Sequence, residues 1–430
     1  MIELGVIADD LTGGMMVASL LEREGVHCPL VTSPRALSDL NPGAEAVVIG
    51  RKIRLIPAAE AVDDANSSAR GLVAAGVKRI YYKYCATFDS TDQGNIGPIA
   101  EGLMKTLNTD RTIFCPAFPE YSVTIFQGRM FLGTTMLGES GKRFDPVTPM
   151  TNSNLVEVLQ AQSQGKTGLL SHTTLMTGPK SAADYVERQV SEGTGLFVTD
   201  AVDNEDSKRI AELTLDWPLT TGADALPMFY ARAWREQAGQ TLSPPSVPQP
   251  NLLSAAPGYE AVIAGSCAEA TRRQVDYFEN VHPVYRIDLL NASSDFEAEL
   301  ADWATPRLSQ GPIAVTTSAD VEGVKRAQAE LGIQGAADLA DALLGKAAVV
   351  LQRLGVRKFV VAGGETSGQV FVALGITAVQ VAPFDNLSGG YCHQAGPDPM
   401  SFVLKAGALG DQTFMFTALE RMRQADQSED

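Results

Sequence analysis

The sequence has no long apolar segment and no excess of basic charge. No apolar run approaches the roughly 20 residues that a membrane-spanning helix needs, so we expect no contact with a membrane. The 51 acidic residues outnumber the 34 basic ones and give a formal charge of −17. Such a surface repels nucleic acid phosphates unless basic residues cluster, and no basic cluster is present. We therefore predict small-molecule ligands and no nucleic acid partner.

Cysteine is scarce, and signals of export are missing. The five cysteines are spread along the chain without a CxxC pair, which argues against a disulfide framework and a structural zinc site. The first residues lack the basic stretch and cleavage site of a secretory signal. We therefore predict a cytoplasmic protein, and a homodimer is one assembly that fits an acidic enzyme of this size.

Two common nucleotide-binding signatures are also absent. No GxGxxG follows a strand-like run, which disfavours a dinucleotide-dependent dehydrogenase. Gly165, Lys166 and Thr167 match the end of a Walker A motif, but Gln160 stands where its first glycine belongs. The sequence therefore predicts no P-loop, and a nucleotide would have to bind elsewhere.

The length and the alternation of elements predict two α/β domains with largely parallel sheets. A chain of 430 residues exceeds the size of a usual single core. Apolar strand-like runs alternate with helical stretches on both sides of a proline-rich segment, in which a helix cannot form. We predict an N-terminal domain over residues 1–240, a linker over 241–258 and a C-terminal domain over 259–430.

The expected elements follow from apolar periodicity. The expected strands are 2–8, 46–49, 79–84, 112–115, 196–199, 261–264, 313–316 and 358–362. The clearest expected helices are 57–75, 97–107, 269–278 and 336–354.

Two adjacent carboxylates follow the first strand-like run. Asp9 and Asp10 come directly after it, and a threonine and two glycines then lead into a helix. In an open α/β sheet, ligands bind at the carboxyl ends of the strands. The pair could orient substrate hydroxyls, act as a base or hold a magnesium ion. Alternatively, one aspartate only caps the helix.

A second polar cluster lies in KYCATFDSTDQGNIGP, residues 83–98. Lys83 ends a strand-like run. The loop after it carries carboxylate, hydroxyl and amide groups at Asp89, Ser90, Thr91 and Asn95. Such groups before a helix N-terminus suit a carboxylate or phosphate ligand, although a lysine at a strand end is also common as a solvated residue.

Two glycine-containing turns in the second half indicate a nucleotide site. In VVAGGETSGQV, residues 360–370, a buried-type strand turns through Gly363 and Gly364 into a helix that we expect to begin near Ser367. A similar strand and turn lead to Ser266. Glycines let backbone amides approach phosphate closely, and hydroxyls add contacts. Each turn alone could also be only a turn.

These segments together resemble the four-carbon acid sugar kinase family. IADDLTGG is similar to the opening signature of the family, and KYCATFDSTDQGNIGP is similar to the form found in its 3-oxo-tetronate kinases. CPAFPE, FQGRMFLG and ESGKRFDPVTPMTNSNL extend the likeness, and AGSCAEATRRQ and AGGETSG resemble its nucleotide-binding segments. The resemblance spans nearly the whole chain.

The resemblance implies an ATP- and Mg²⁺-dependent kinase, with its site in a cleft between a sugar-acid-binding and a nucleotide-binding domain. The implied reaction is phosphorylation of 3-oxo-tetronate at its C4 hydroxyl. The implied catalytic residues are Asp10, Lys83 and Asp89, with Asp10 or Asp89 as base. The implied substrate-binding residues are Asp9, Arg54, Ser90, Thr91 and Asn95. The implied ATP-binding residues are Ser266, Gly363, Gly364, Glu365, Thr366, Ser367, Gly407 and Gly410.

Three departures from the family pattern leave other functions open. Members usually carry an aspartate at the position of Met16, KSGNFG where this chain has KAGALG (405–410), and a glycine-richer turn where it has TGAD (221–224). The alternatives are a kinase for threonate, erythronate or a branched acid, and a non-catalytic homologue that binds a sugar acid or nucleotide.

Overall fold

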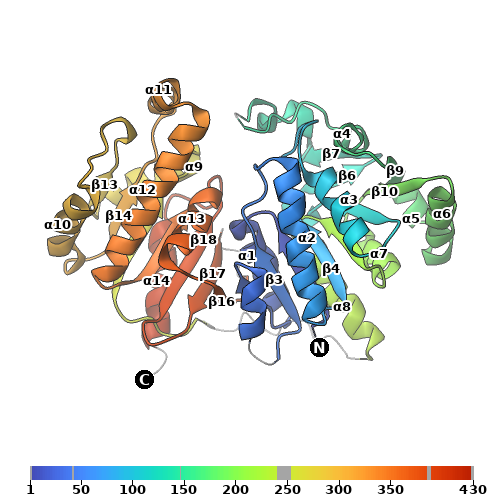
Figure 1. The fold of residues 1–430 in the computed structure, drawn as a ribbon, viewed down its shortest axis with the longest axis horizontal. Coiled ribbons are helices and arrows are strands. Elements are labelled where there is room, and N and C mark those ends of the chain that lie inside the picture. Colours follow the sequence, from blue (N-terminus) through green and yellow to red (C-terminus); the bar gives the residue numbers. More distant parts are fainter. Residues whose placement is uncertain (1, 41–42, 146, 240–252, 385–388, 428–430) are drawn as a thin grey trace. The chain divides into compact units, whose positions relative to one another are not determined.

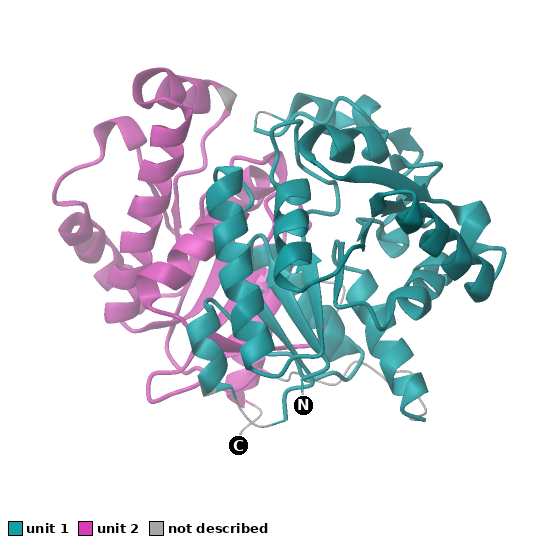
Figure 2. Ribbon diagram, turned by 45° about the vertical axis from the view of Figure 1, so that its right-hand side comes forward, with its two compact units in different colours: residues 1–246 teal, residues 247–430 magenta. Residues whose placement is uncertain are grey.

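The computed structural model describes residues 2–40, 43–145, 147–239, 253–384 and 389–427. The chain divides into two compact units, residues 1–246 and 247–430 (Figure 2). The division falls within the expected linker 241–258, of which residues 241–252 lie outside the described ranges. Each unit is an α/β domain.

Unit 1 is built on a sheet of parallel strands (Figure 1). Among its described residues the strand order is β2-β3-β1-β4-β11-β5-β10-β9, and every neighbouring pair is parallel. The strands are β1 (Leu4–Ala8), β2 (Leu30–Val31), β3 (Ala46–Gly50), β4 (Arg79–Lys83), β5 (Thr112–Cys115), β9 (Lys166–Leu170), β10 (Thr194–Thr199) and β11 (Leu219–Gly222). β2, β9 and β11 were not among the expected strands.

Helices cover both faces of this sheet, which is why its strands are apolar on both sides. One layer contains α2 (Ala58–Ala74), α3 (Ile96–Thr106) and α4 (Leu155–Gln162), which pack against one another in this order. The connections from β1, β9 and β10 run in the opposite direction and, being right-handed, place their helices on the other face. This layer contains α1 (Leu11–Arg23), α5 (His172–Leu175), α6 (Pro179–Ser191), α7 (Asn204–Thr214) and α8 (Leu226–Gln237).

A small antiparallel sheet extends unit 1. Its strands are β6 (Val123–Phe126), β7 (Arg129–Leu132) and β8 (Thr135–Met136). The sequence analysis did not expect these strands, because they are short and lie in a segment rich in turns. The segment that resembles a Walker A motif starts strand β9 after helix α4, so it is not a P-loop.

Unit 2 has a mixed sheet. Among its described residues the order is β13-β14-β12-β15-β18-β17-β16. The strands are β12 (Tyr259–Ala264), β13 (Val284–Arg286), β14 (Ile313–Thr316), β15 (Val356–Ala362), β16 (Ala378–Val381), β17 (Gly389–Gln394) and β18 (Met400–Lys405). β17 is antiparallel to both β16 and β18, whereas the other pairs are parallel. The expectation of largely parallel sheets therefore holds with one antiparallel edge.

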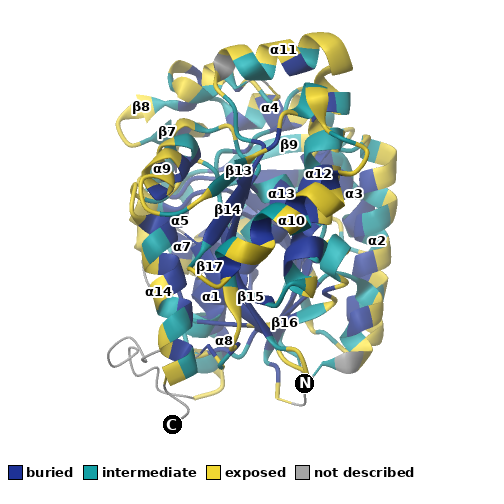
Figure 3. Cartoon of the chain, turned by 90° about the vertical axis from the view of Figure 1, so that its left-hand side faces the viewer, coloured by how far each residue is buried: buried dark blue, intermediate teal, exposed yellow. Residues whose placement is uncertain are grey.

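The core of unit 2 lies between this sheet and its helices (Figure 3). On one face, α9 (Glu269–Glu279) and α14 (Phe414–Gln427) bury Phe278, Met415 and Leu419 against the strands. The other helices are centred on α12 (Ile333–Arg353). Those that pack against α12 are α10 (Phe296–Leu308), α11 (Val321–Leu331) and α13 (Gly364–Leu374). No helix within the described ranges is both long enough and apolar enough to cross a membrane.

Each unit has a point where the connections from two neighbouring strands run in opposite directions along the sheet, away from each other. In unit 1 this point lies between β1 and β4, which lead into α1 and α3. In unit 2 it lies between β12 and β15, which lead into α9 and α13. In open α/β sheets, ligands bind in the crevice at the carboxyl ends of such strands. We therefore expect the ligands to bind at the loops after these four strands.

Candidate functional site

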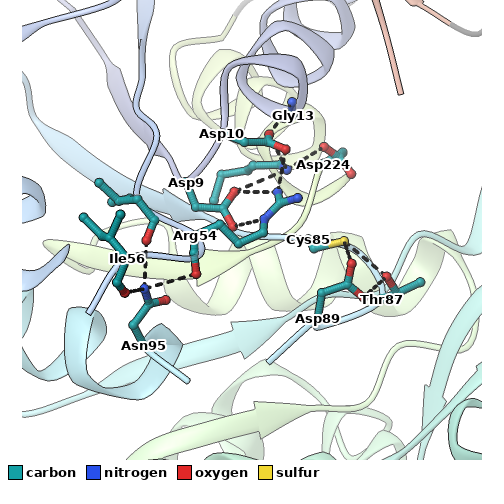
Figure 4. A network of polar contacts seen from close by, with 12 residues as sticks. Asp9, Asp10, Gly13, Arg54, Ile56, Cys85, Thr87, Asp89, Asn95 and Asp224 are labelled. Carbon is teal, nitrogen blue, oxygen red and sulfur yellow. Dashed lines mark hydrogen bonds and ion pairs between the residues drawn. The ribbon is translucent and has the colours of Figure 1, made fainter. Parts of the chain in front are cut away.

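The loops after three adjacent strands of unit 1 bring a charged cluster together (Figure 4). Asp9 and Asp10 follow β1, Lys83 ends β4 and Asp224 follows β11. Because parallel strands end at the same edge of a sheet, these side chains converge. Arg54, from the loop after β3, completes the cluster. Four of these five residues were predicted from the sequence, and Asp224 was not.

Arg54 holds the two adjacent carboxylates side by side. Its Nε and Nη2 donate hydrogen bonds to the two oxygens of Asp9 at 2.7 and 2.8 Å. Its Nη2 also lies 2.9 Å from Oδ2 of Asp10. Such a planar fork is a geometry that only arginine supplies. Asp9 is 2% exposed, so this pairing compensates a buried charge.

Lys83 lies between the carboxylates and is not solvated. Its side chain is 3% exposed, and its Nζ lies 3.8, 3.9 and 3.5 Å from carboxylate oxygens of Asp9, Asp10 and Asp224. Burial lowers the pKa of Lys83, but the three carboxylates outweigh it and raise the pKa above its ordinary value. The alternative of a solvated lysine is therefore wrong.

Gly13 is the residue that makes room for Lys83. A Cβ atom at position 13 would lie 1.9 Å from the Nζ of Lys83. The glycine in the opening signature thus allows the ammonium group to approach the backbone of α1.

Asp10 caps helix α1 and also pairs with Arg54. Its Oδ1 accepts a hydrogen bond of 2.6 Å from Gly13 N–H, which caps α1, while Oδ2 faces Arg54. Burial would raise the pKa of Asp10, but the charges of Arg54 and Lys83 and the bond from Gly13 lower it below its ordinary value. Asp10 is therefore held in the ionised form.

Asn95 supports the cluster rather than joining it. Its Nδ2 donates to the carbonyl oxygens of Ile53, Arg54 and Ile56 at 2.8, 3.2 and 3.2 Å. These bonds fix the loop that carries Arg54 (Figure 4). Asn95 thus positions Arg54, and its contact with substrate stays a prediction.

Asp89 lies in a second polar group next to the cluster. It accepts hydrogen bonds from Lys142 Nζ at 2.8 Å and Thr87 Oγ1 at 2.6 Å, and Cys85 Sγ is 3.2 Å away. Burial and the charge of Asp89 raise the pKa of the Cys85 thiol to about 11. Cys85 is therefore a neutral thiol and not a nucleophile.

Ser90 and Thr91 face a different neighbour. Ser90 Oγ contacts the amide of Gln162 on α4, and the carbonyl oxygen of Thr91 accepts a bond from the same amide at 3.2 Å. Both residues line a separate surface pocket together with Met150 and Asn152. The structure therefore places them beside the charged cluster, and not within it.

The loops of unit 2 that were expected to bind ATP converge at the carboxyl ends of β12, β15 and β18. The space around the glycines shows how closely these loops approach one another, because a Cβ atom added at a glycine would meet the neighbouring loop. A Cβ at Gly265 would lie 2.2 Å from Thr366 Oγ1, and one at Gly407 would lie 2.0 Å from Ser266 Oγ. Ser266, Gly363, Thr366 and Gly407 thus share one small region, although they are up to about 140 positions apart in sequence.

Gly363 forms the turn into α13 by itself. Its φ of +131° is a conformation that favours glycine, and a Cβ would meet Thr366 Oγ1 at 2.8 Å. Helix α13 therefore begins at Gly364, three residues before the expected start near Ser367. Gly364, Glu365, Thr366 and Ser367 form its first turn, and Ser367 Oγ donates to Gly363 O at 2.8 Å. Backbone N–H groups at such a helix start suit a phosphate.

The loop after β18 is held by a buried lysine. Lys405 Nζ donates to the carbonyl oxygens of Ala406, Gly407 and Leu409 at 2.9, 3.1 and 2.9 Å. Burial lowers its pKa to about 8. Gln274 Nε2 donates to the carbonyl oxygen of Gly410 at 3.0 Å. Gly407 and Gly410 thus lie in a loop fixed from two sides.

The structure adds two residues to the predicted sites. Asp224 was missed because β11 was not an expected strand, so its position at a strand end was not recognised. Thr317 follows β14, is 6% exposed, and its Oγ1 has no hydrogen-bond partner within the described chain. A carboxylate or hydroxyl within two residues after a strand would have been the signal for both.

The loops of unit 2 have the features of a phosphate-binding site. A buried hydroxyl without a partner, glycines at close approach and the N-terminus of α13 fit the phosphates of a nucleotide. Within the described ranges, no group of three or more His, Cys, Asp or Glu side chains could hold a metal ion. A Mg²⁺ ion would therefore have to take most of its ligands from the nucleotide and water.

Comparisons with known proteins agree with this division. Residues 4–229 match the model of the sugar-binding N-terminal domain, and residues 261–415 match that of the nucleotide-binding C-terminal domain. The chain is 36% identical to the 3-oxo-tetronate kinase of Cupriavidus necator, over 97% of both chains.

Solved structures show the same fold. A Salmonella typhimurium protein is 33% identical with a TM-score of 0.82, covering 97% of this chain and 99% of that one. A Haemophilus influenzae protein of family DUF1537 is 30% identical with a TM-score of 0.73, covering 97% of this chain and 100% of that one. The chain is thus a sugar acid kinase, a phosphotransferase with an alcohol acceptor. With both domain models matched in order, it belongs to the four-carbon acid sugar kinase family.

Proposed function

We propose that this enzyme transfers the γ-phosphoryl group of ATP to the C4 hydroxyl of 3-oxo-tetronate and forms 3-oxo-tetronate 4-phosphate. The observation that carries the proposal is the cluster of Asp9, Asp10, Arg54 and Lys83 at the switch point of the sugar-binding unit. Carboxylate oxygens accept hydrogen bonds from sugar hydroxyls, and the two cations offset the charge of the acid. Relatives named 3-oxo-tetronate kinase support the choice of acid.

In this proposal unit 2 binds ATP at the loops of Ser266, Gly363 to Ser367, and Gly407 to Gly410. Mg²⁺ accompanies the phosphates and neutralises charge as the phosphoryl group moves. The work of this chain is to position the acid and the phosphates and to stabilise charge. That the two ligands meet in a cleft between the domains stays a prediction.

The alternative acids stay possible substrates because Met16, the 405–410 loop and the 221–224 turn differ from the usual family pattern. Threonate, erythronate and branched acids carry the same carboxylate and terminal hydroxyl. The non-catalytic homologue loses support, since the chain is a sugar acid kinase by its relatives.

The test is a coupled ADP-release assay with ATP, Mg²⁺ and a panel of four-carbon and branched acids and their oxo forms. We expect the highest kcat/KM for an oxo-tetronate, and a loss of about 100-fold or more in Asp10→Asn and Lys83→Ala. Preference for another acid would replace the substrate. Absence of ADP release with every acid would refute the proposal.

A further inference from the structure

The carboxylates around the sugar-acid site differ in how strongly they are engaged. Both oxygens of Asp9 accept hydrogen bonds from Arg54, at 2.7 and 2.8 Å. One oxygen of Asp10 accepts from Gly13 N–H at 2.6 Å, and the other lies 2.9 Å from Arg54. Neither carboxylate has an oxygen left without a close donor. A proton acceptor needs a lone pair that can face the substrate hydroxyl.

Asp89 is occupied in the same way. Lys142 Nζ and Thr87 Oγ1 donate to its two oxygens at 2.8 and 2.6 Å. The ammonium group of Lys142 would have to be displaced before a hydroxyl could approach that oxygen. Asp10 and Asp89, the two bases that the sequence suggested, are therefore both committed to other partners.

Asp224 is different. Its closest cationic partner is Lys83, whose Nζ lies 3.5 Å from Oδ1, beyond the usual length of a charge-assisted hydrogen bond. The side chain is 13% exposed, as are those of Asp10 and Asp89, so the weaker pairing and not the exposure distinguishes Asp224. It is the second residue after β11, the strand next to β4 in the sheet, and it faces the same cluster as Asp10 (Figure 4).

We propose that in this chain Asp224, part of the 221–224 turn that departs from the usual family pattern, is the proton acceptor of the kinase reaction, an inference that rests on the proposed function. The oxygen of the acid's hydroxyl forms a bond to the γ-phosphorus of ATP, and the bond from that phosphorus to the bridging oxygen of ADP breaks. The hydroxyl proton passes to a carboxylate oxygen of Asp224 and is then released to water. ADP leaves with the electron pair of the broken bond.

The pKa of Asp224 is raised and that of Asp10 is lowered, which makes Asp224 the stronger base of the two. Burial raises the pKa of Asp224 most; Lys83 and Arg54 lower it, Asp10 and Asp9 raise it, and the pKa lies above the ordinary value. The titratable and charged groups that face it are Lys83, Asp9, Asp10, Arg54, Tyr81 and Tyr121. Because the base must be unprotonated, activity falls as the pH falls through this pKa. The fall begins at a higher pH than for an ordinary aspartate.

The test compares the pH profile of kcat/KM in the wild type and in Asp224→Asn, with the acid that gives the highest wild-type turnover. We expect kcat to fall by about 100-fold or more, while the affinity for the acid, measured by calorimetry without ATP, changes by less than about fivefold. The acidic limb of the wild-type profile should disappear in the variant. Asp224→Ser, which also lacks a carboxylate, repeats the test if the asparagine variant is poorly folded.

Asp216→Asn is the matched control. Asp216 precedes β11 at the opposite end of the strand and is 80% exposed, so this variant should keep the wild-type profile. If Asp224→Asn retains kcat within about threefold, or loses kcat but keeps the acidic limb, the inference is wrong although the kinase function stands. If the wild type releases no ADP with any acid, the proposed function itself fails and this inference with it.

Discussion

At the scale of the residue, Arg54 determines how the charged cluster holds together. Two adjacent buried carboxylates repel each other unless a cation lies between them. Arg54 binds Asp9 through two nitrogens and reaches Asp10 with one of them, so a single planar group contacts both carboxylates. Lys83 adds the second positive charge from the neighbouring strand. Because one guanidinium group contacts both carboxylates, the cluster depends on the shape of the cation as well as on its charge.

Arg54→Lys keeps the charge but loses the two-nitrogen contact. We therefore expect kcat/KM to fall by about 100-fold and the free energy of unfolding to fall by about 2 to 4 kcal/mol. Steady-state kinetics and chemical unfolding measure the two effects. Arg51→Lys is the control, because Arg51 makes a similar fork with Asp64, at 2.7 and 2.6 Å, outside the cluster. Equal losses of kcat/KM in both variants would contradict a specific role for the Arg54 fork.

Some of the residues in the charged cluster, and some of their roles, were predictable from the sequence, and others were not. The motif residues Asp9, Asp10 and Lys83 stand at strand ends, so their convergence follows from the parallel sheet. Asn95 lies in an equally conspicuous motif, but its contacts with the carbonyl oxygens of residues 53–56 depend on how two loops pack. Sequence patterns identify polar residues near a site; they do not tell which of them face the ligand.

At the scale of the element, the start of α13 determines the shape of the nucleotide site. Gly363 leaves β15 with a φ of +131°, and the helix follows immediately at Gly364. This short turn places Gly363, at the start of α13, close to Ser266 after β12. A longer turn, as expected from the sequence, would have moved the start of the helix away by nearly a helical turn.

Gly363→Ala should weaken ATP binding by about 10-fold or more, because alanine is strained at this φ and its Cβ would lie 2.8 Å from Thr366 Oγ1 and 3.3 Å from Ser266 N. Isothermal titration calorimetry with ATP alone measures the change. Gly375→Ala is the matched control at the other end of the same helix. Its φ is +68°, but nothing lies within 4 Å of the added Cβ. It should cost about 1 kcal/mol of stability and leave ATP binding nearly unchanged.

The sequence analysis missed short or weakly apolar strands such as β2 and β11, and it also missed β18 (MSFVLK), which is mostly apolar and fully buried. All eight expected strands exist, since their residues are buried on both faces and form continuous apolar runs. β11 has the sequence LTTG, and its two threonines give it a polar pattern although all four of its residues are buried. Missing β11 also meant missing Asp224, so an error at the scale of the element became an error at the site.

At the scale of the whole molecule, each unit carries the switch point for one ligand. The charged cluster in unit 1 consists of side chains, which suits recognition of hydroxyls and a carboxylate. The site in unit 2 consists largely of backbone at glycines and at a helix start, which suits phosphates. The two units therefore divide the substrates by chemistry, in keeping with the order of the two domain models along the chain.

This division predicts that each ligand binds the full chain alone and that a substitution in one unit affects one ligand. In calorimetry with single ligands, Asp10→Asn should weaken binding of the acid by about 10-fold or more and change ATP affinity by less than about twofold, because a lost charged acceptor is felt only by the group it faces. Gly363→Ala should do the reverse, and both variants should lose turnover, which needs both ligands together. Loss of ATP affinity in Asp10→Asn would mean that residues of unit 1 contribute to the nucleotide site, because the two substitutions would then no longer be energetically independent.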